Sequence, residues 1–531
     1  MGSSCRRAND GVGGSQSNND IIKVFTPSRS VADLLRAWHH RCVRLALAIA
    51  VGLVLFLGTR PSRAVPSFAR KYNTSCQTCH TAFPVLNPFG EAFRRNGFRF
   101  PSVSRSEDSD AAKEETLPLG QEEYEKTFPN SVWPDRISQT VPLSLLVGGG
   151  VNYVMPNSDL HATTGNTFTW NGVANPVSFF AAGSFSDRLT YYIKVVASSG
   201  GAKIGAAYLA WNDLIGPRHL INVWFGRLTA PQLTSYGPSG SYVADKAMPA
   251  VSIAGLFNPN NSFILGGPSD GAELNGIALH RISYSMGWLA STAQTGLTVP
   301  TSEDAYLHLG AKFGGMSLDG EGPRGMETVN AKKPWAETSF TFDTFGYHGV
   351  TVADNMTNSP NMTPQRSAVD SIGHAARLNL ESLILSGMFQ YQVHHRPYIG
   401  ASPTAANPPV QPNALPGAPD NLKGHGYIGS AELAYVIYPW LIPAVRAEYT
   451  LLGSDWGKAS LLRIMPGATF LVRPNVRIYV VGDIEHAYKL PPAAPLNPSW
   501  WTLAGGSVLP QPGNSSKTEV EQISAVVSWA L

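Results

Sequence analysis

The sequence predicts a mainly β protein, an antiparallel membrane barrel of about 16 strands preceded by a small N-terminal helical segment. Three observations predict this fold. Charged residues make up only 15% of the 531 residues, whereas about a quarter is usual in soluble proteins. Glycine and proline are plentiful, at 51 and 40 residues, which indicates many turns. Short segments of alternating apolar and polar residues recur from residue 139 to the C-terminus.

The alternation has the period of two that places successive side chains on opposite faces of a strand. Val445 and Tyr449, for example, alternate with Arg446 and Glu448. The same period recurs in residues 189–195, 433–437, 476–485 and 523–531. We expect the apolar set to face lipid and the polar set to face the lumen. A soluble sandwich or propeller is the alternative, but no repeat of blade length is visible.

Segments rich in glycine, proline, serine or asparagine separate these strands at 229–274, 396–427 and 489–518. A short turn is expected near Ser186 and Asp187. Long loops at one end and short turns at the other are usual for membrane barrels. An even number of strands would place both ends of the barrel domain, 139–531, on the periplasmic side.

The first 64 residues contain the three parts of a secretory signal. Basic residues at 41–44 precede an apolar run of 14 residues, Leu45 to Gly58, and Ser62-Arg63-Ala64 forms a small-x-small cleavage site. A membrane-spanning helix needs about 20 apolar residues, so the run is too short for an anchor. The segment 1–64 is therefore expected to be an N-terminal extension and export signal. The net charge of +3 gives no indication of nucleic-acid binding.

Residues 76–80 read Cys-Gln-Thr-Cys-His, the motif that attaches a c-type haem. The thiols of Cys76 and Cys79 form thioethers with the haem vinyl groups, and His80 supplies the proximal ligand of the iron. A redox-active dithiol would sit in a thioredoxin-like pattern, and a zinc site would need a second cysteine pair in the mature chain. Neither is visible, so one covalently bound haem c is expected in the segment 65–100.

The distal ligand of this iron stays open. No histidine or methionine occurs between Thr81 and Val154, and the first candidates are Met155 and His161. A lysine, the new α-amino group or a five-coordinate iron are the other possibilities. We also expect Phe83, Leu86, Phe89 and Phe93 to form an apolar face on short helical turns, with Phe83 and Phe89 packing on the haem. About 36 residues are too few to fold without such help.

This segment resembles the fused outer-membrane cytochrome–porin family of iron-oxidising bacteria. The residues that match its pattern, in order, are Pro66, Phe68, Ala69, Arg70, Pro84, Leu86, Phe89, Gly90, Phe93, Asn96, Gly97 and Phe98. The match covers residues 65 to 100; Lys71-Tyr72-Asn73 replaces the usual Gln-x-Gly, and Phe98 stands where tyrosine is common. Beyond residue 100 the resemblance is one of architecture.

The resemblance implies an iron-oxidase type of electron-transfer protein in the outer membrane. Fe(II) would be the donor outside the cell, and a periplasmic cytochrome or copper protein the acceptor. The cytochrome segment would lie on the periplasmic or lumen side of the barrel. The alternatives are a transport porin whose haem-bearing segment is a plug or sensor, and a conduit for a donor other than iron.

Two further features carry weaker expectations. Residues 101–138 are rich in acids, including Glu107, Asp108 and Glu114, which indicates a solvated linker. A carboxylate-rich attractor of cations near the haem is the sharper interpretation. His394 and His395 lie beside a proline-rich loop, where an ordinary pair is favoured over a metal site because no further ligand spacing is visible.

Overall fold

The computed structural model describes residues 67–72 and 74–99 of the N-terminal part, and from 143 to 530 it describes the strands with part of their connections. The predicted extension and export signal at 1–64 lie outside the described residues. Residues Val65–Leu531 form one compact unit. Of the acidic linker, the structure describes only three short pieces, two of which, β3 (Thr116–Pro118) and β4 (Arg136–Ser138), pair antiparallel.

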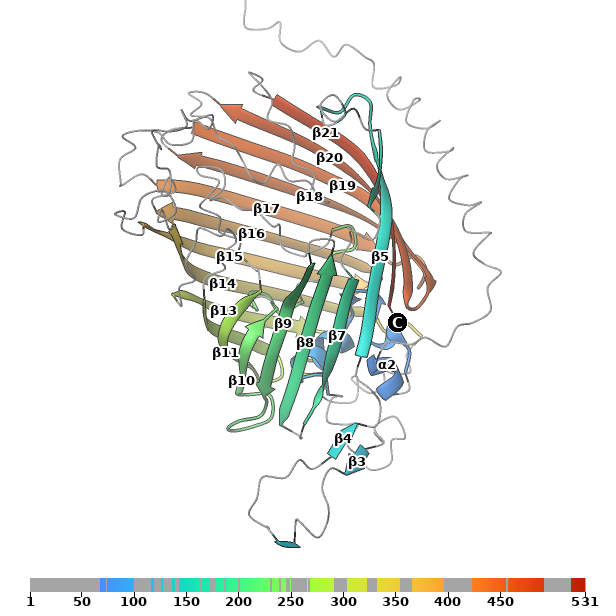
Figure 1. Ribbon diagram of the computed structural model, residues 1–531, viewed down its shortest axis with the longest axis vertical. Coiled ribbons are helices and arrows are strands. Elements are labelled where there is room, and N and C mark those ends of the chain that lie inside the picture. The colour runs from blue at the N-terminus through green and yellow to red at the C-terminus, as the bar shows by residue number, and fades with distance from the viewer. Residues whose placement is uncertain are drawn as a thin grey trace, which may run out of the picture. The chain divides into compact units, whose positions relative to one another are not determined.

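A closed antiparallel barrel dominates this unit (Figure 1). Its described strands are β5 (Leu143–Val154), β6 (Phe168–Asn171), β7 (Val177–Ser184), β8 (Leu189–Ser198), β9 (Gly201–Trp211), β10 (Asn222–Leu228), β11 (Ser269–Ala278), β12 (Ile282–Leu289), β13 (Asp304–Gly314), β14 (Glu337–Ala353), β15 (Gln365–Glu381), β16 (Leu383–His395), β17 (Lys423–Tyr435), β18 (Leu441–Ser454), β19 (Gly457–Arg473), β20 (Val476–Leu490) and β21 (Lys517–Ala530). The last strand, β21, pairs with β5 and closes the barrel.

The strands β6 and β7 occupy a single position in the wall. β6 pairs with one half of β5, at Gly150–Tyr153, and β7 pairs with the other half, at Leu143–Leu146. Counted this way, the described strands give 16 positions, and the predicted strand number is confirmed. Within the described residues, no helix is long and apolar enough to cross a membrane.

The register of the strands defines two ends of the barrel. Leu146 pairs with Ala530, so β5 begins and β21 ends on the same side. We name this side the terminal end; the connections 185–188, 279–281 and 474–475 lie there. The opposite side, the loop end, carries the connections 229–268, 396–422 and 491–516. Most of the predicted long loops lie outside the described residues, but β11 and β17 begin earlier than expected, so residues 269–274 and 423–427 are strand.

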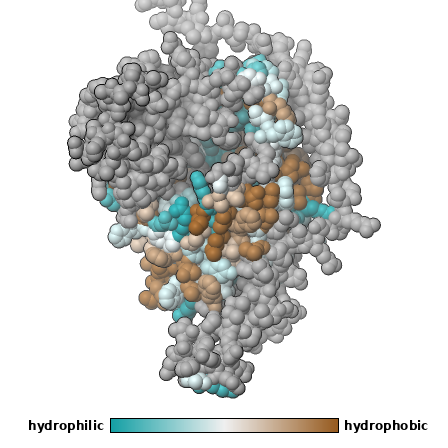
Figure 2. All heavy atoms as spheres, in the orientation of Figure 1, coloured by the Kyte–Doolittle hydropathy of each residue, from teal (hydrophilic) through white to brown (hydrophobic). Residues whose placement is uncertain are grey.

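Side chains on the two faces of the wall differ as predicted. Tyr449 and Leu433 point outward and are 49% and 42% exposed, whereas Arg446 and Glu432 point inward and are buried. Figure 2 shows hydrophobic side chains gathered on the outer face of the barrel. An apolar outside and a polar inside are the reverse of a soluble protein, and they fit a barrel whose outer face meets lipid.

Candidate functional site

The haem motif lies in a small folded segment built from α2 (Ser67–Lys71), a 3₁₀ turn η1 (Cys76–Thr78), a hairpin of β1 (His80–Ala82) and β2 (Val85–Leu86), and α3 (Pro88–Arg95). We call residues 67–99 the plug. The expectation of helical turns after the motif is correct for Phe89 and Phe93, which lie on α3. It is wrong for Phe83 and Leu86, because His80 pairs with Leu86 in the hairpin and Phe83 occupies its turn.

The 3₁₀ turn brings the two cysteines together. The backbone N–H of Cys79 donates to the carbonyl of Cys76 over 3.2 Å. Side chains at positions i and i+3 eclipse in a 3₁₀ turn, so both thiols lie on one side of it. Neither is in a disulfide, and both are partly exposed. Burial raises the pKa of Cys79 to about 12, whereas a redox-active dithiol needs a lowered pKa. The local chemistry therefore fits thioether attachment better than thiol–disulfide exchange.

Asn87 and Gly90 hold this turn on the start of α3. The Asn87 side chain donates to the carbonyls of Gln77 and Thr78 at 3.0 and 2.9 Å, and its Oδ1 accepts from the N–H of Gly90. It is thus the N-cap of α3, followed by a proline at the first helical position, a common arrangement. A Cβ on Gly90 would lie 2.0 Å from the carbonyl oxygen of Cys79, so only glycine permits this approach.

His80 has the properties of an iron ligand that lacks its metal. Its Nδ1 is buried and has no hydrogen-bond partner within the described part of the chain. Burial lowers the pKa of His80 to about 4, so the imidazole is neutral at pH 7 and a ring lone pair is free to bind a metal. Two unbridged thiols on one turn, followed by an imidazole whose Nδ1 has no partner, fit a covalently attached haem. Cys76, Cys79 and His80 are the residues that would hold it.

The two phenylalanines expected to pack on the haem differ in their surroundings. The Phe83 ring lies 5.2 Å from the His80 ring, centroid to centroid, and is partly exposed. Phe83 is therefore placed to cover a group bound at His80. Phe89 is fully buried, in the core of the plug. A second aromatic group joins α2 to the end of α3, since the Phe68 ring packs on Phe93 and stacks on Phe98.

The plug lies against the inner wall at the terminal end of the barrel, where Figure 1 shows its helices in blue beside β5 and β7. The Ser67 N–H donates to Ser144 of β5 over 2.9 Å, and the Phe83 carbonyl accepts from Arg477 of β20 over 3.1 Å. The Phe98 ring stacks on Tyr192 of β8 at 5.3 Å. The strands β20, β5 and β8 are near neighbours in the barrel, so these contacts fix the plug to one side of the wall.

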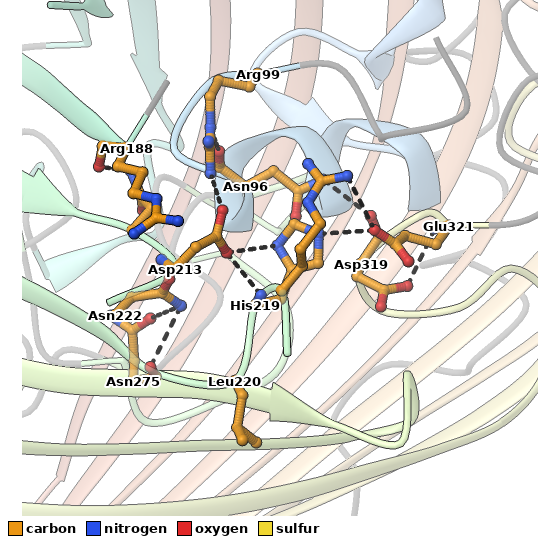
Figure 3. A network of polar contacts seen from close by, with 12 residues as sticks. Asn96, Arg99, Arg188, Asp213, His219, Leu220, Asn222, Asn275, Asp319 and Glu321 are labelled. Carbon is orange, nitrogen blue, oxygen red and sulfur yellow. Dashed lines mark hydrogen bonds and ion pairs between the residues drawn. The ribbon is translucent and has the colours of Figure 1, made fainter. Parts of the chain in front are cut away.

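The end of α3 is fixed by polar groups of two connections at the same end. Asn96 donates to the backbone carbonyl of Asp319 over 2.9 Å. Arg99 forms an ion pair of 3.2 Å with Asp213. Figure 3 shows these four residues together. All of them are largely buried, which makes the contacts stronger than ion pairs at a free surface.

The connection between β10 and β11 folds inward and covers the plug. Arg95 of the plug donates to the Ser235 carbonyl, and Glu91 accepts from the N–H of Gly237 over 2.6 Å. Further along, Glu432 of β17 accepts from the N–H of Tyr242 over 2.9 Å. Burial lowers the pKa of Arg95 to about 10, so it stays charged at neutral pH. The lumen therefore holds two inserted segments bonded to each other and to the wall.

A cavity remains between these segments and the wall. It has an empty volume of about 600 Å³, which includes open solvent. Thr81 and Glu91 of the plug line it, together with Lys312, Glu337 and Arg377 of the wall. Leu318, Trp335 and Ile384 add an apolar part to the lining, and the thiols and His80 are not part of it.

The first candidates for the distal ligand are far from His80. Met155 donates to the carbonyl of Glu521, which pairs with Ile484 of β20. The Phe83 carbonyl accepts from Arg477, which lies on the same strand as Ile484. At about 3.3 Å per residue, Arg477 and Ile484 are roughly 20 Å apart along β20. His161 lies in the connection that Met155 begins. The structure thus brings neither candidate to the plug.

The histidine pair of β16 is divided between the two faces of the wall. His394 is fully buried, whereas His395 is partly exposed and lies 2.8 Å from Asp370. They are not joint ligands, in agreement with the interpretation as an ordinary pair.

Sequence reasoning missed Asn87 and Arg95. The Asn-Pro-x-Gly pattern of a helix start could have indicated Asn87. No local signal marks Arg95, because its partners lie about 140 residues away.

No protein-family model matches the chain, and no curated protein matches it. Solved structures are similar in fold. The anion-selective porin from Comamonas acidovorans has 12% identity and a TM-score of 0.44, covering 74% of this chain and 99% of that chain. The outer membrane protein OmpT of Vibrio cholerae has 10% identity and a TM-score of 0.43, covering 74% and 97%. OmpF of Salmonella typhi has 11% identity and a TM-score of 0.41, covering 74% and 98%.

These likenesses concern the barrel and carry no statement about the plug. The strand pairing of the chain itself establishes the architecture, a closed antiparallel barrel of 16 positions in the described residues. Barrels of this size are wide enough for an aqueous channel. In this chain, the plug and the inserted connection occupy part of that space.

Proposed function

We propose that this chain is an outer-membrane electron conduit in which one c-type haem, attached to Cys76 and Cys79 and ligated by His80, sits inside the barrel. The observation that carries the proposal is that the haem-binding turn belongs to a plug bonded to the lumen wall. A haem held there would be in the lumen, between the two sides of the membrane.

The membrane location is supported by the outer face of the barrel, where Phe225, Trp288 and Tyr449 are exposed. A barrel also satisfies every backbone hydrogen bond within lipid, as a spanning segment must. The terminal end is the periplasmic end in this proposal, because short turns such as 279–281 and 474–475 lie there and the longest connections lie at the other end. The plug would then be accessible to a periplasmic carrier.

When bound, the haem supplies one-electron redox chemistry. Fe(II) outside the cell gives up one electron and becomes Fe(III), and a periplasmic cytochrome or copper protein accepts that electron. The chain's own residues position the site: Asn87 holds the turn, and Phe83 shields the His80 ring. The choice of Fe(II) rests on the resemblance of residues 65–100 to cytochrome–porins of iron-oxidising bacteria.

The experiment is reconstitution of the mature protein, expressed with haem-attachment machinery, into liposomes that enclose a ferric redox protein. We expect covalent haem staining on a denaturing gel, and rapid reduction of the haem and of the enclosed protein by external Fe(II). The variants Cys76→Ser with Cys79→Ser should fold as barrels and lose both signals. Absence of haem staining in the wild-type protein would overturn the proposal.

A transport porin with a haem-bearing plug is the alternative, and the cavity that remains between the plug and the wall is the observation that supports it. Small sugars and ions should leak through such a porin. We expect slow leakage from the same liposomes, because the plug and residues 232–237 and 240–244 of the connection after β10 occupy part of the lumen. Fast sugar exchange without reduction of the haem by Fe(II) would favour the porin. A rapid response to another donor, but none to Fe(II), would indicate a conduit of different specificity.

A further inference from the structure

A second group of metal-ligating side chains lies at the terminal end, where Asn96 of the plug meets Asp319. It consists of His280, Asp319 and Glu321. We propose that these three residues bind a divalent transition-metal cation, separate from the haem iron. The proposal rests on their geometry and does not depend on the proposed electron-transfer function.

The ligand atoms of the three residues already face a common point. One atom from each lies within 4.8 Å of the other two. The His280 Nδ1 is 2.6 Å from Oδ2 of Asp319 and 4.0 Å from Oε2 of Glu321. A cation placed between them would replace the hydrogen bond from His280 to Asp319. Because the His280 side chain is 61% exposed, the remaining coordination positions can be filled by water.

The carboxylates are held by contacts that use their other oxygens. Glu321 Oε1 is 3.2 Å from Nε2 of His219 and 3.5 Å from Arg218, which leaves Oε2 toward His280. Asp319 Oδ1 accepts from the N–H of Glu321 over 3.1 Å. Figure 3 shows the carboxylates of Asp319 and Glu321 beside the His219 ring. Such outer contacts fix the orientation of metal ligands and strengthen binding.

An unsatisfied acceptor of the plug belongs to the side chain that bonds to Asp319. The Asn96 side chain is 2% exposed, and its Nδ2 donates to the carbonyl of Asp319, but its Oδ1 is buried without a partner in the described residues. A buried acceptor without a partner destabilises the fold unless a donor is supplied. A water molecule bound to the cation would be a donor for it. Asp319 is likewise a buried carboxylate, which a cation would compensate.

The ligand set selects the class of metal. One imidazole nitrogen and two carboxylate oxygens suit Zn(II), Mn(II) or Fe(II), whereas Ca(II) prefers six to eight oxygens. His280 belongs to the connection between β11 and β12, and Asp319 and Glu321 to the one between β13 and β14. The cation would therefore join two connections of the wall at the point where the end of the plug is attached. We infer that it stabilises the docked plug.

The test is equilibrium dialysis of the full haem-loaded protein against Zn(II), with bound zinc measured by atomic emission, since haem iron is counted separately. We expect one zinc per chain, with an affinity that His280→Ala and Glu321→Gln each lower about tenfold or more. His395→Ala is the matched control, because His395 is also partly exposed and ion-paired with a carboxylate, that of Asp370, but lies at the loop end of the barrel. It should bind zinc like the wild type.

A second measurement follows the fold. Zinc should raise the temperature at which the plug becomes sensitive to protease in the wild type and in His395→Ala, but not in His280→Ala. His280 is largely exposed, so its removal leaves the barrel intact, and circular dichroism verifies this. Equal zinc binding by His280→Ala and the wild type would overturn the site. Equal binding of Ca(II) and Zn(II) would overturn the assignment to a transition metal. Neither result depends on reduction of the haem.

Discussion

Arg95 of the plug and Ser235 of the connection after β10 form the contact that joins these two inserted segments. Nε of Arg95 donates to the Ser235 carbonyl over 3.2 Å, and the N–H of Ser235 donates to Asp343 of the wall over 2.9 Å. A cation of the plug is thus connected through one backbone unit to an anion of β14. Loss of this contact should loosen both inserted segments together.

Arg95→Ala should destabilise the docked plug by about 2–3 kcal/mol, because it leaves buried carbonyls without their charged donor. We expect faster proteolysis of the plug and faster leakage of small solutes from liposomes, measured with the haem-loaded protein. Arg227→Ala is the control, since Arg227 pairs with an exposed acid, Asp270, on the outer face. An exposed pair contributes little. Equal leakage of both variants would contradict the role of Arg95.

Gly90→Ala should disturb the haem-binding turn directly. The added Cβ would lie 2.0 Å from the Cys79 carbonyl oxygen and 2.9 Å from the Leu86 side chain, so the turn has to move away from α3. We expect several-fold less covalent haem, measured by the pyridine haemochrome spectrum relative to protein. Gly346→Ala in β14 is the control, because its nearest neighbour would be 4.0 Å away. Normal haem content in Gly90→Ala would show that the close approach of Gly90 to the Cys79 carbonyl is not needed for haem attachment.

The barrel could be predicted from the sequence because its signal is local. A period of two along each strand decides which side chains face outward, and residues such as Tyr449 and Arg446 occupy the expected faces. The ends of strands were less certain. Residues 269–274 were expected in a loop because glycine and serine are frequent there, but they pair with β10 and β12, and tertiary pairing overrides local composition.

The site could be predicted only in part. The Cys-x-x-Cys-His spacing alone predicts Cys76, Cys79 and His80 as haem-binding residues, and the structure adds that the two thiols share one 3₁₀ turn. The docking residues could not be found this way, because Arg95 and Arg477 bind backbone carbonyls that carry no sequence signature. The group of His280, Asp319 and Glu321 is likewise invisible in sequence, since two separate connections supply it.

Asn87→Ala should weaken the plug without touching the haem ligands. The variant removes two donors to the carbonyls of Gln77 and Thr78, and also removes the cap of α3. Loss of a cap alone costs about 1 kcal/mol, and unpaired buried carbonyls add to this. We expect a lower midpoint in thermal unfolding followed by the haem absorbance. Ser75→Ala is the control, because Ser75 Oγ accepts only an exposed hydrogen bond of 3.3 Å from the Gln77 N–H. A shift of the unfolding midpoint in Ser75→Ala as large as that in Asn87→Ala would contradict the role of Asn87 in holding the turn.

Because of the ion pair between Arg99 and Asp213, the attachment of the plug should weaken at low pH. Burial raises the pKa of Asp213, but the His219 N–H and the Arg99 guanidinium outweigh it, and the pKa lies below its ordinary value of 3.8. A lowered pKa in the folded state means that the ionised carboxylate stabilises the fold. This contribution is complete above the ordinary value and is lost as the pH falls through the lowered pKa.

Asp213→Asn should therefore lower the protease resistance of the plug at pH 7, by about 1 kcal/mol for a partly buried pair. The difference from the wild type should shrink below about pH 4, where the unfolded carboxyl is already protonated. Proteolysis across this pH range, with an acid-active protease at the low end, measures it. Asp270→Asn serves as the control, because its pair with Arg227 is exposed and should have little effect at any pH. A destabilisation by Asp213→Asn that stays constant from pH 7 to the lowest pH would show that the carboxylate charge is not what attaches the plug.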